Sequence, residues 1–208
     1  MSQSLVNPFA ISPAYAPAMT SRRLSRLLLP DGPGNPYHTL DCDATLVLHD
    51  PRGSRATFQR KQAIRFTQNG VSALLDRAWG DGVILTNYRH SAGLMEDTFK
   101  DGGVRHLIVG LKRPASKGQE LRFVVERETM ESFGDSKGTL QTGFDHPIGH
   151  FSQTIIFPKE RPVQLAVLRQ PMGDIVLRAI QLPDGRTAIK VRLSSPELGS
   201  KYAVDWSW

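Results

Sequence analysis

The chain has 208 residues, of which 39% are hydrophobic and 22% are charged, and its 26 basic and 20 acidic side chains give a formal net charge of +6. This hydrophobic fraction supports a folded core, so a chain disordered throughout is excluded. No apolar run approaches the eighteen residues of a membrane-spanning helix, and the first residues lack the pattern of a secretory signal. Together with the single cysteine, Cys42, these features predict a cytoplasmic protein of one or two domains.

Residues 1–36 contain six of the fourteen prolines. Each proline removes a backbone donor and disfavours helix in the residue before it, so we expect a flexible proline-rich arm. Within this arm, Arg22, Arg23 and Arg26 lie among four leucines at positions 24 and 27–29. The pattern is typical of a loosely docked linker, and the two alternatives are a helix that binds a partner or a membrane surface and an organelle transit peptide.

From Tyr37 onward, short runs of alternating apolar and polar residues are separated by clusters of Gly, Pro, Asn and Asp. This alternation predicts strands that have one buried face and one solvent-exposed face. Turn-rich residues predict a hairpin across residues 49–53 and a turn at residues 183–185. After a first strand that contains Leu46 and Leu48, we expect strands at residues 56–66, 83–88, 105–111, 120–127, 151–157, 163–169, 174–182, 187–193 and 202–208.

The fold class follows from the number of strands and the scarcity of helical patterns. Only residues 71–79 have roughly helical spacing, so they are the best candidate for a short helix. About ten strands without alternating helices predict an all-β fold, an antiparallel β-sandwich that is Ig-like or two-lobed, over residues 37–208. A closed barrel is the main rival. The glycine-rich residues 131–149 form either a long loop or a hinge between two β lobes.

The C-terminal strand has a clear buried face. Tyr202, Val204, Trp206 and Trp208 share one parity of the alternation, and polar or small residues occupy the other. We therefore expect the last two tryptophans to close the core from the C-terminus.

Candidate catalytic residues are few. His146 and His150 have the i,i+4 spacing of zinc ligands on a helix, but Pro147 and Gly149 lie between them and disfavour a helix. We keep this pair as the metal-binding alternative, within a hydrolase or metal enzyme, and otherwise expect no metal or cofactor. Cys42 lies between two aspartates, whose charges raise the pKa of a thiol, so it is not an expected nucleophile.

Basic side chains are densest around the strand at residues 56–66. Arg55, Lys61 and Arg65 are candidates for contact with nucleic acid, together with the three arginines of the arm. The aromatic residues are expected in the core and not among these cations, which disfavours base stacking. Arg60 has the parity of the buried face, unless a bulge intervenes.

The segment most like a binding site covers residues 76–97, where aromatic and charged residues lie beside glycine turns. Loops and strand ends of this composition are typical of recognition surfaces. The residues expected to bind a partner are Trp79, Asp81, Tyr88, Arg89 and His90.

A further set of motifs runs through residues 40–208: Trp79-Gly80-Asp81-Gly82, Tyr88, Ser91, Gly93, Lys117-Gly118 with the strand after it, Phe157-Pro158, Arg161-Pro162, Tyr202, Trp206 and Trp208. In these motifs the chain resembles an uncharacterised bacterial all-β module that is associated with signalling and conflict (antiviral defence) proteins. The resemblance implies a sensing or adaptor role beside a separate effector, and it implies no catalytic residues.

The sequence therefore predicts a non-enzymatic β-sandwich that binds another macromolecule, with a phage, host or effector protein as its partner. The first alternative is a nucleic-acid-binding β domain, which would lose affinity steeply with salt. The second alternative is the hydrolase or metal enzyme. An exposed strand edge could also form a homo-oligomer.

Overall fold

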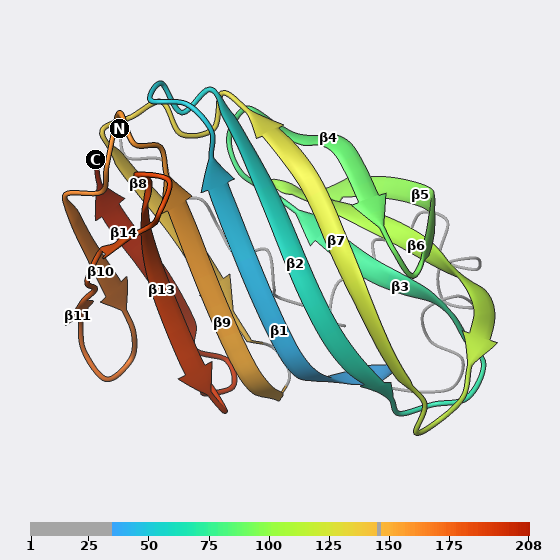
Figure 1. Ribbon diagram of the computed structural model, residues 1–208. Helices are drawn as coiled ribbons and strands as arrows, with labels where there is room; N and C mark the ends of the chain where they lie inside the picture. The colour runs from blue at the N-terminus through green and yellow to red at the C-terminus, as the bar shows by residue number, and fades with distance from the viewer. Residues whose placement is uncertain (1–34, 145–146) are drawn as a thin grey trace.

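The computed structural model describes residues 35–144 and 147–208, and these residues form fourteen strands in three sheets (Figure 1). The large sheet has seven strands in the order β12 (Ile180–Gln181), β13 (Thr187–Ser194), β9 (Ile148–Phe157), β1 (Tyr37–Leu48), β2 (Arg55–Phe66), β7 (Glu120–Met130) and β4 (Val83–His90). The four-stranded sheet has the order β11 (Ile175–Val176), β10 (Leu165–Arg169), β14 (Lys201–Ser207) and β8 (Lys137–Gly143). The three-stranded sheet has the order β3 (Val71–Ala78), β6 (Val104–Ala115) and β5 (Gly93–Asp101).

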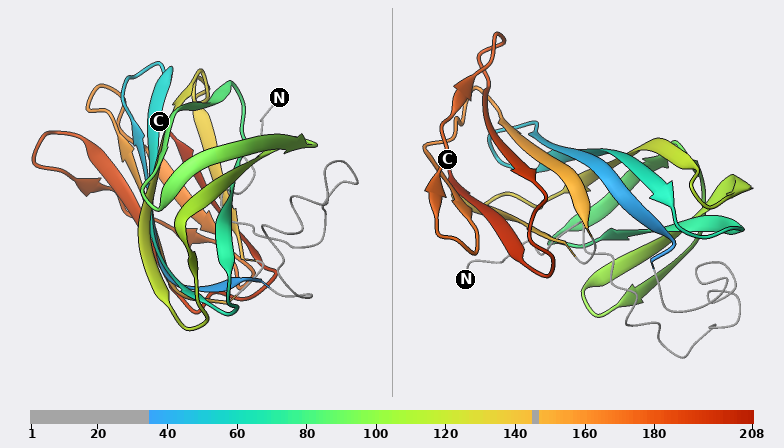
Figure 2. Two further views of the ribbon diagram at one scale, coloured as in Figure 1. Left: turned by 90° about the vertical axis from the view of Figure 1, so that its right-hand side faces the viewer. Right: turned by 90° about the horizontal axis from the view of Figure 1, so that it is seen from below.

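The two smaller sheets pack on one face of the large sheet, which makes the molecule a sandwich (Figures 1 and 2). The four-stranded sheet covers the part of the large sheet near β9 and β13, and the three-stranded sheet covers the part near β2 and β7. Strands β1 and β9 are parallel, and all other pairs are antiparallel. The predicted all-β sandwich is confirmed. None of the described residues forms a helix that could cross a membrane.

Two hydrophobic clusters form the core, one under each small sheet. The larger cluster lies under the four-stranded sheet and contains Trp206 and Trp208, which are both buried. Their rings meet the ring of Phe157, on the large sheet, in edge-to-face geometry. The expectation that the C-terminal tryptophans close the core is therefore confirmed.

The predicted helix at residues 71–79 is wrong, because Val71–Ala78 is strand β3. A bulge separates Val71 from Ala73, so the buried positions change parity along the strand. An inward position is also occupied by a charged residue, Asp76. The bulge and the buried charge together break the alternation and imitate helical spacing.

The two predicted turns are confirmed. Strands β1 and β2 are antiparallel neighbours, and the Asp50 carboxylate accepts hydrogen bonds from the amides of Arg52, Ser54 and Arg55 in the turn between them. Strands β12 and β13 are joined around Gly185, whose φ of +86° suits glycine.

The number and bounds of the strands differ from the prediction. Residues 174–182 form not one strand but β11 and β12, which belong to different sheets. Strand β5 was not predicted, because its side chains are almost all exposed and carry no clear alternation. Strand β8 lies inside the glycine-rich stretch at residues 131–149.

Candidate functional site

The five residues predicted to bind a partner do not share one exposed surface. Trp79 is buried just after β3, and Asp81 is partly buried in the turn before β4. Tyr88 and His90 are partly buried on β4, and Arg89 is exposed between them. The segment therefore contributes most of its aromatic side chains to the interior.

The interior here contains a buried ion pair between β2 and β3. The Arg60 guanidinium donates to the Asp76 carboxylate at 2.9 Å, and both side chains are more than nine-tenths buried. The Tyr88 hydroxyl donates to the other carboxylate oxygen at 2.9 Å, and the Arg77 amide donates to the first oxygen at 2.8 Å. Asp76, on β3, therefore ties the three-stranded sheet to the large sheet through two of these three bonds, those from Arg60 on β2 and Tyr88 on β4.

Arg127, on β7, is a second buried guanidinium beside this pair. It donates to the Arg77 carbonyl at 3.3 Å, and it lies over the Phe58 ring at 4.8 Å. Burial lowers the pKa of Arg127 to about 10, although the charge of Asp76 opposes this change. The sequence analysis did not predict Asp76 or Arg127 as members of a cluster. The inward position of Arg60 was a signal for it, because a buried guanidinium needs a carboxylate partner.

Burial and charge shift the pKa values of the cluster in opposite directions. Burial alone would raise the pKa of Asp76, but the charges of Arg60 and Arg127 hold it below its usual value. Burial raises the pKa of Tyr88, and the Asp76 charge raises it further. Burial lowers the pKa of His90 to about 4, so this imidazole is neutral at neutral pH. Its ring stacks on the ring of Phe123, with 4.7 Å between the two ring centroids.

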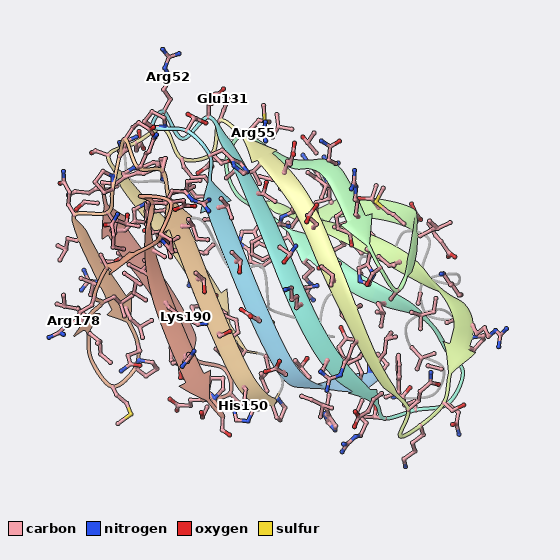
Figure 3. All side chains as sticks on the ribbon, viewed as in Figure 1. Arg52, Arg55, Glu131, His150, Arg178 and Lys190 are labelled. Atoms are coloured by element: carbon pink, nitrogen blue, oxygen red, sulfur yellow. The ribbon has the colours of Figure 1, made fainter. Side chains whose placement is uncertain are left out.

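The predicted nucleic-acid contacts of β2 lie on the outer face of the large sheet, where carboxylates accompany them. Lys61 and Arg65 are exposed on this face, and Arg65 is bonded to Glu120 at 2.6 Å. Lys61 lies opposite Asp43 on β1. Arg55 is exposed at the start of the strand (Figure 3). The arginines of the arm, Arg22, Arg23 and Arg26, lie outside the described residues.

The metal-binding alternative has one described member. His150 is exposed on β9, and His146 lies outside the described residues. Within residues 35–144 and 147–208, no three His, Cys, Asp or Glu side chains are grouped as a metal site. Cys42 is buried, and burial, more than the two flanking aspartates, raises its pKa to about 12.

Exposed apolar side chains are concentrated at the other end of the molecule. Nine large hydrophobic residues are exposed in the described part of the chain, and five of them lie between residues 165 and 180. Single exposed apolar residues are common, but a group of them along one edge is typical of an interaction surface. We call these five residues the apolar edge: Leu165, Met172, Ile175, Val176 and Ile180.

The apolar edge lies where the free edges of two sheets meet. Strand β11 is the edge strand of the four-stranded sheet, and β12 is the edge strand of the large sheet. Each of them contains only two residues. The outer face of the four-stranded sheet is hollowed beside this edge into a groove of about 570 Å³, to which β8, β10 and β14 contribute. Leu165 belongs to both the groove and the apolar edge.

Two of the four charged side chains that line the groove, Arg169 and Asp205, are paired with each other. The Asp205 carboxylate accepts a hydrogen bond from Thr139 at 2.8 Å and one from Arg169 at 3.0 Å, and Arg169 is also paired with Asp174. The Asp205 carboxylate is therefore held by a threonine and an arginine.

No family model matches the chain, and no curated protein sequence matches it. Among solved structures, a mutant M1 zinc metallopeptidase from Deinococcus radiodurans, bound to a Tyr-Ser-Ala substrate, matches with a TM-score of 0.50 and 10% identity. A second structure of the mutant enzyme without that substrate matches with a TM-score of 0.49 and 9% identity. In both matches 81% of this chain is covered, and the chain spans 42% of the length of the metallopeptidase chain. At this identity the likeness shows the fold alone.

Proposed function

We propose that this chain is a non-enzymatic β-sandwich that binds another protein, in a sensing or adaptor role. The observation that carries the proposal is the apolar edge, where five of the nine exposed large hydrophobic side chains of the described residues are gathered. Apolar surface that is exposed along a sheet edge is stabilised when a partner covers it.

One further observation supports this proposal. Of the residues expected to bind a partner, Trp79 is buried, Tyr88 donates to the buried Asp76 carboxylate and the His90 ring stacks on Phe123, so these side chains serve the interior. The resemblance to modules of bacterial signalling and antiviral defence extends the proposal to a phage, host or effector protein as the partner.

The test is a pull-down from native cells at low and high salt, with and without nuclease. The tested variant combines Val176→Asp with Ile180→Asp, and the matched control combines Val83→Asp with Leu94→Asp, two exposed apolar residues of β4 and β5. We expect a protein that resists salt and nuclease to be recovered with the native chain and the control variant and to be lost with the edge variant.

Two outcomes would overturn the proposal. Recovery of the same protein by the edge variant would exclude the apolar edge as the binding surface. Recovery of nucleic acid that disappears at high salt, in place of a protein, would favour the nucleic-acid-binding alternative and its candidates Lys61 and Arg65.

A further inference from the structure

Strand β13 has a long open edge. All eight of its residues pair with β9 on one side. On the other side, β12 pairs only with Thr187 and Ala188. No other described residue pairs with β13 on that side, so residues 189–194 present unpaired backbone groups at the border of the large sheet.

The edge is open because the chain before β12 belongs to the other sheet. Strand β11 pairs with β10, and the Leu177 amide donates to the Ala166 carbonyl at 2.8 Å. If β12 extended back toward its N-terminal side, residues 174–179 would pair with β13. Residues 175–177 bond to β10 instead, so no described residue occupies the strand position beside residues 189–194.

The two faces of this open edge differ in chemistry. Ile189 and Val191 are buried on the inner face, and Lys190 and Arg192 are exposed on the outer face. Figure 3 shows Lys190 on the outer face of the sheet and Arg178 at its border. A strand that occupied the vacant position would therefore meet cations on one face and the apolar core on the other.

Three of the four cations at this edge form no ion pair with a described carboxylate. Residues 175–194 contain four basic side chains and one acidic side chain, Asp184, which is bonded to Arg186 at 2.7 Å. Among the described residues, none of the ion pairs includes Arg178, Lys190 or Arg192. Acidic side chains of a partner would complement the charge of this edge.

We propose that an extended segment of a partner protein, with alternating acidic and apolar residues, adds to the large sheet along residues 189–194 of β13. Its acidic side chains would lie opposite Lys190 and Arg192, and its apolar side chains would face the core beside the neighbouring apolar edge. This inference rests on the proposed function and names the chemistry of the partner. A second copy of the chain fits poorly, because pairing of two β13 edges would bring like cations together.

The probes that test this inference are two acetylated octapeptides at neutral pH. In one, glutamate alternates with valine, and in the other, lysine alternates with valine. Backbone amide hydrogen exchange of the full chain, followed by NMR, reports which strand edge each peptide protects. At about ten times its Kd, the glutamate peptide is expected to slow exchange at amides of residues 189–194 by about tenfold, and the lysine peptide is expected to have no effect there.

The matched variants exchange the charge of the edge. Lys190→Glu combined with Arg192→Glu should weaken the affinity for the glutamate peptide by roughly tenfold and should allow the lysine peptide to bind. Lys112→Glu combined with Arg113→Glu, which reverses two exposed charges at the end of β6, should leave the preference unchanged. All four side chains are exposed, so both variants are expected to fold, and thermal unfolding checks this.

Other results would overturn the inference. Protection of β5 instead of β13, equal binding of both peptides, or the absence of any binding would contradict strand addition by an acidic segment. A concentration-dependent dimer with the same amides protected would assign the edge to a second copy. If the peptides fail while the pull-down still depends on Val176 and Ile180, only this inference fails, and the proposed function stands.

Discussion

The two ends of the sandwich differ in how well their edge strands are protected against pairing with another strand. At one end, β4 has two irregularities in its register and Asn87 in the left-handed region, and β5 has a bulge and several charged side chains. At the other end, β11 and β12 are short, apolar side chains are exposed, and residues 189–194 of β13 are unpaired along their outer side. Bulges and mixed charges are devices that prevent strand pairing, so we call the first end closed, and we call the second end, which lacks these devices, open.

The interior follows the same division. A buried ion pair ties the three-stranded sheet to the large sheet near the closed end, whereas aromatic packing fills the core near the open end. Substitutions at the closed end should therefore change stability and leave binding intact. Substitutions at the surface of the open end should do the reverse.

The largest expected effect comes from removing the buried carboxylate. Asp76→Ala leaves the Arg60 guanidinium buried without its carboxylate partner, so we expect the free energy of unfolding to fall by about 3–5 kcal/mol. Urea denaturation measures this change. The double variant with Arg60→Met should regain only part of the loss, since Arg127 and the Tyr88 hydroxyl still lack the Asp76 carboxylate. A loss below about 1 kcal/mol in Asp76→Ala would show that the pair does not join the sheets.

A smaller loss is expected from a methyl group near the C-terminal tryptophans. A Cβ atom at Gly138 would lie 2.3 Å from the Trp206 ring, which packs against Phe133 and Phe157. Gly138→Ala should destabilise the chain by about 1–3 kcal/mol, because the indole must move within a filled core. Gly103→Ala is the matched control, since no atom lies within 4 Å of its added Cβ, and it should change stability by less than about 0.5 kcal/mol. Equal values for the two variants would contradict the packing.

The third prediction concerns pH. The pKa of His90 is lowered to about 4 in the folded chain, against 6.5 for an ordinary histidine. As the pH falls, the unfolded chain therefore takes up a proton on His90 before the folded chain does. The contribution of neutral His90 to the free energy of unfolding is complete above pH 6.5 and is lost by about pH 4. Since His90 is partly exposed, we expect a loss of about 1–2 kcal/mol.

His90→Gln isolates this contribution. The amide oxygen of glutamine still offers an acceptor for the Ala92 amide, which bonds to the His90 ring in the native chain. The other histidines with a lowered pKa, His49 and His106, are present in both proteins. Urea denaturation from pH 7 to pH 4 should show a shallower loss of stability in His90→Gln, and parallel curves would refute the assignment.

The sequence predicted the all-β sandwich because alternation is a local property of each strand, and it placed Trp206 and Trp208 correctly for the same reason. It did not predict β3 as a strand, since a bulge and a buried Asp76 disturb the alternation there. It also could not predict the open edge of β13. That edge depends on which strand pairs with which, and the two-residue strands β11 and β12 leave almost no local pattern.

The smallest effect on stability is expected at the apolar edge. Val176 and Ile180 are about half exposed or more, so replacing both by aspartate should change the free energy of unfolding by less than about 0.5 kcal/mol. The loss of binding by this variant is then a property of the surface and not of misfolding. A large loss of stability would mean that the edge is part of the core.

The most direct measurement is photo-crosslinking in native cells, with a photoreactive amino acid placed at position 176 on the open end or at position 94 on the closed end. The side chains at these positions are 69% and 82% exposed, so the two proteins are matched in access. We predict that position 176 crosslinks one protein partner and that position 94 does not. Crosslinking of the partner from position 94 alone would contradict the assignment of the binding surface to the open end.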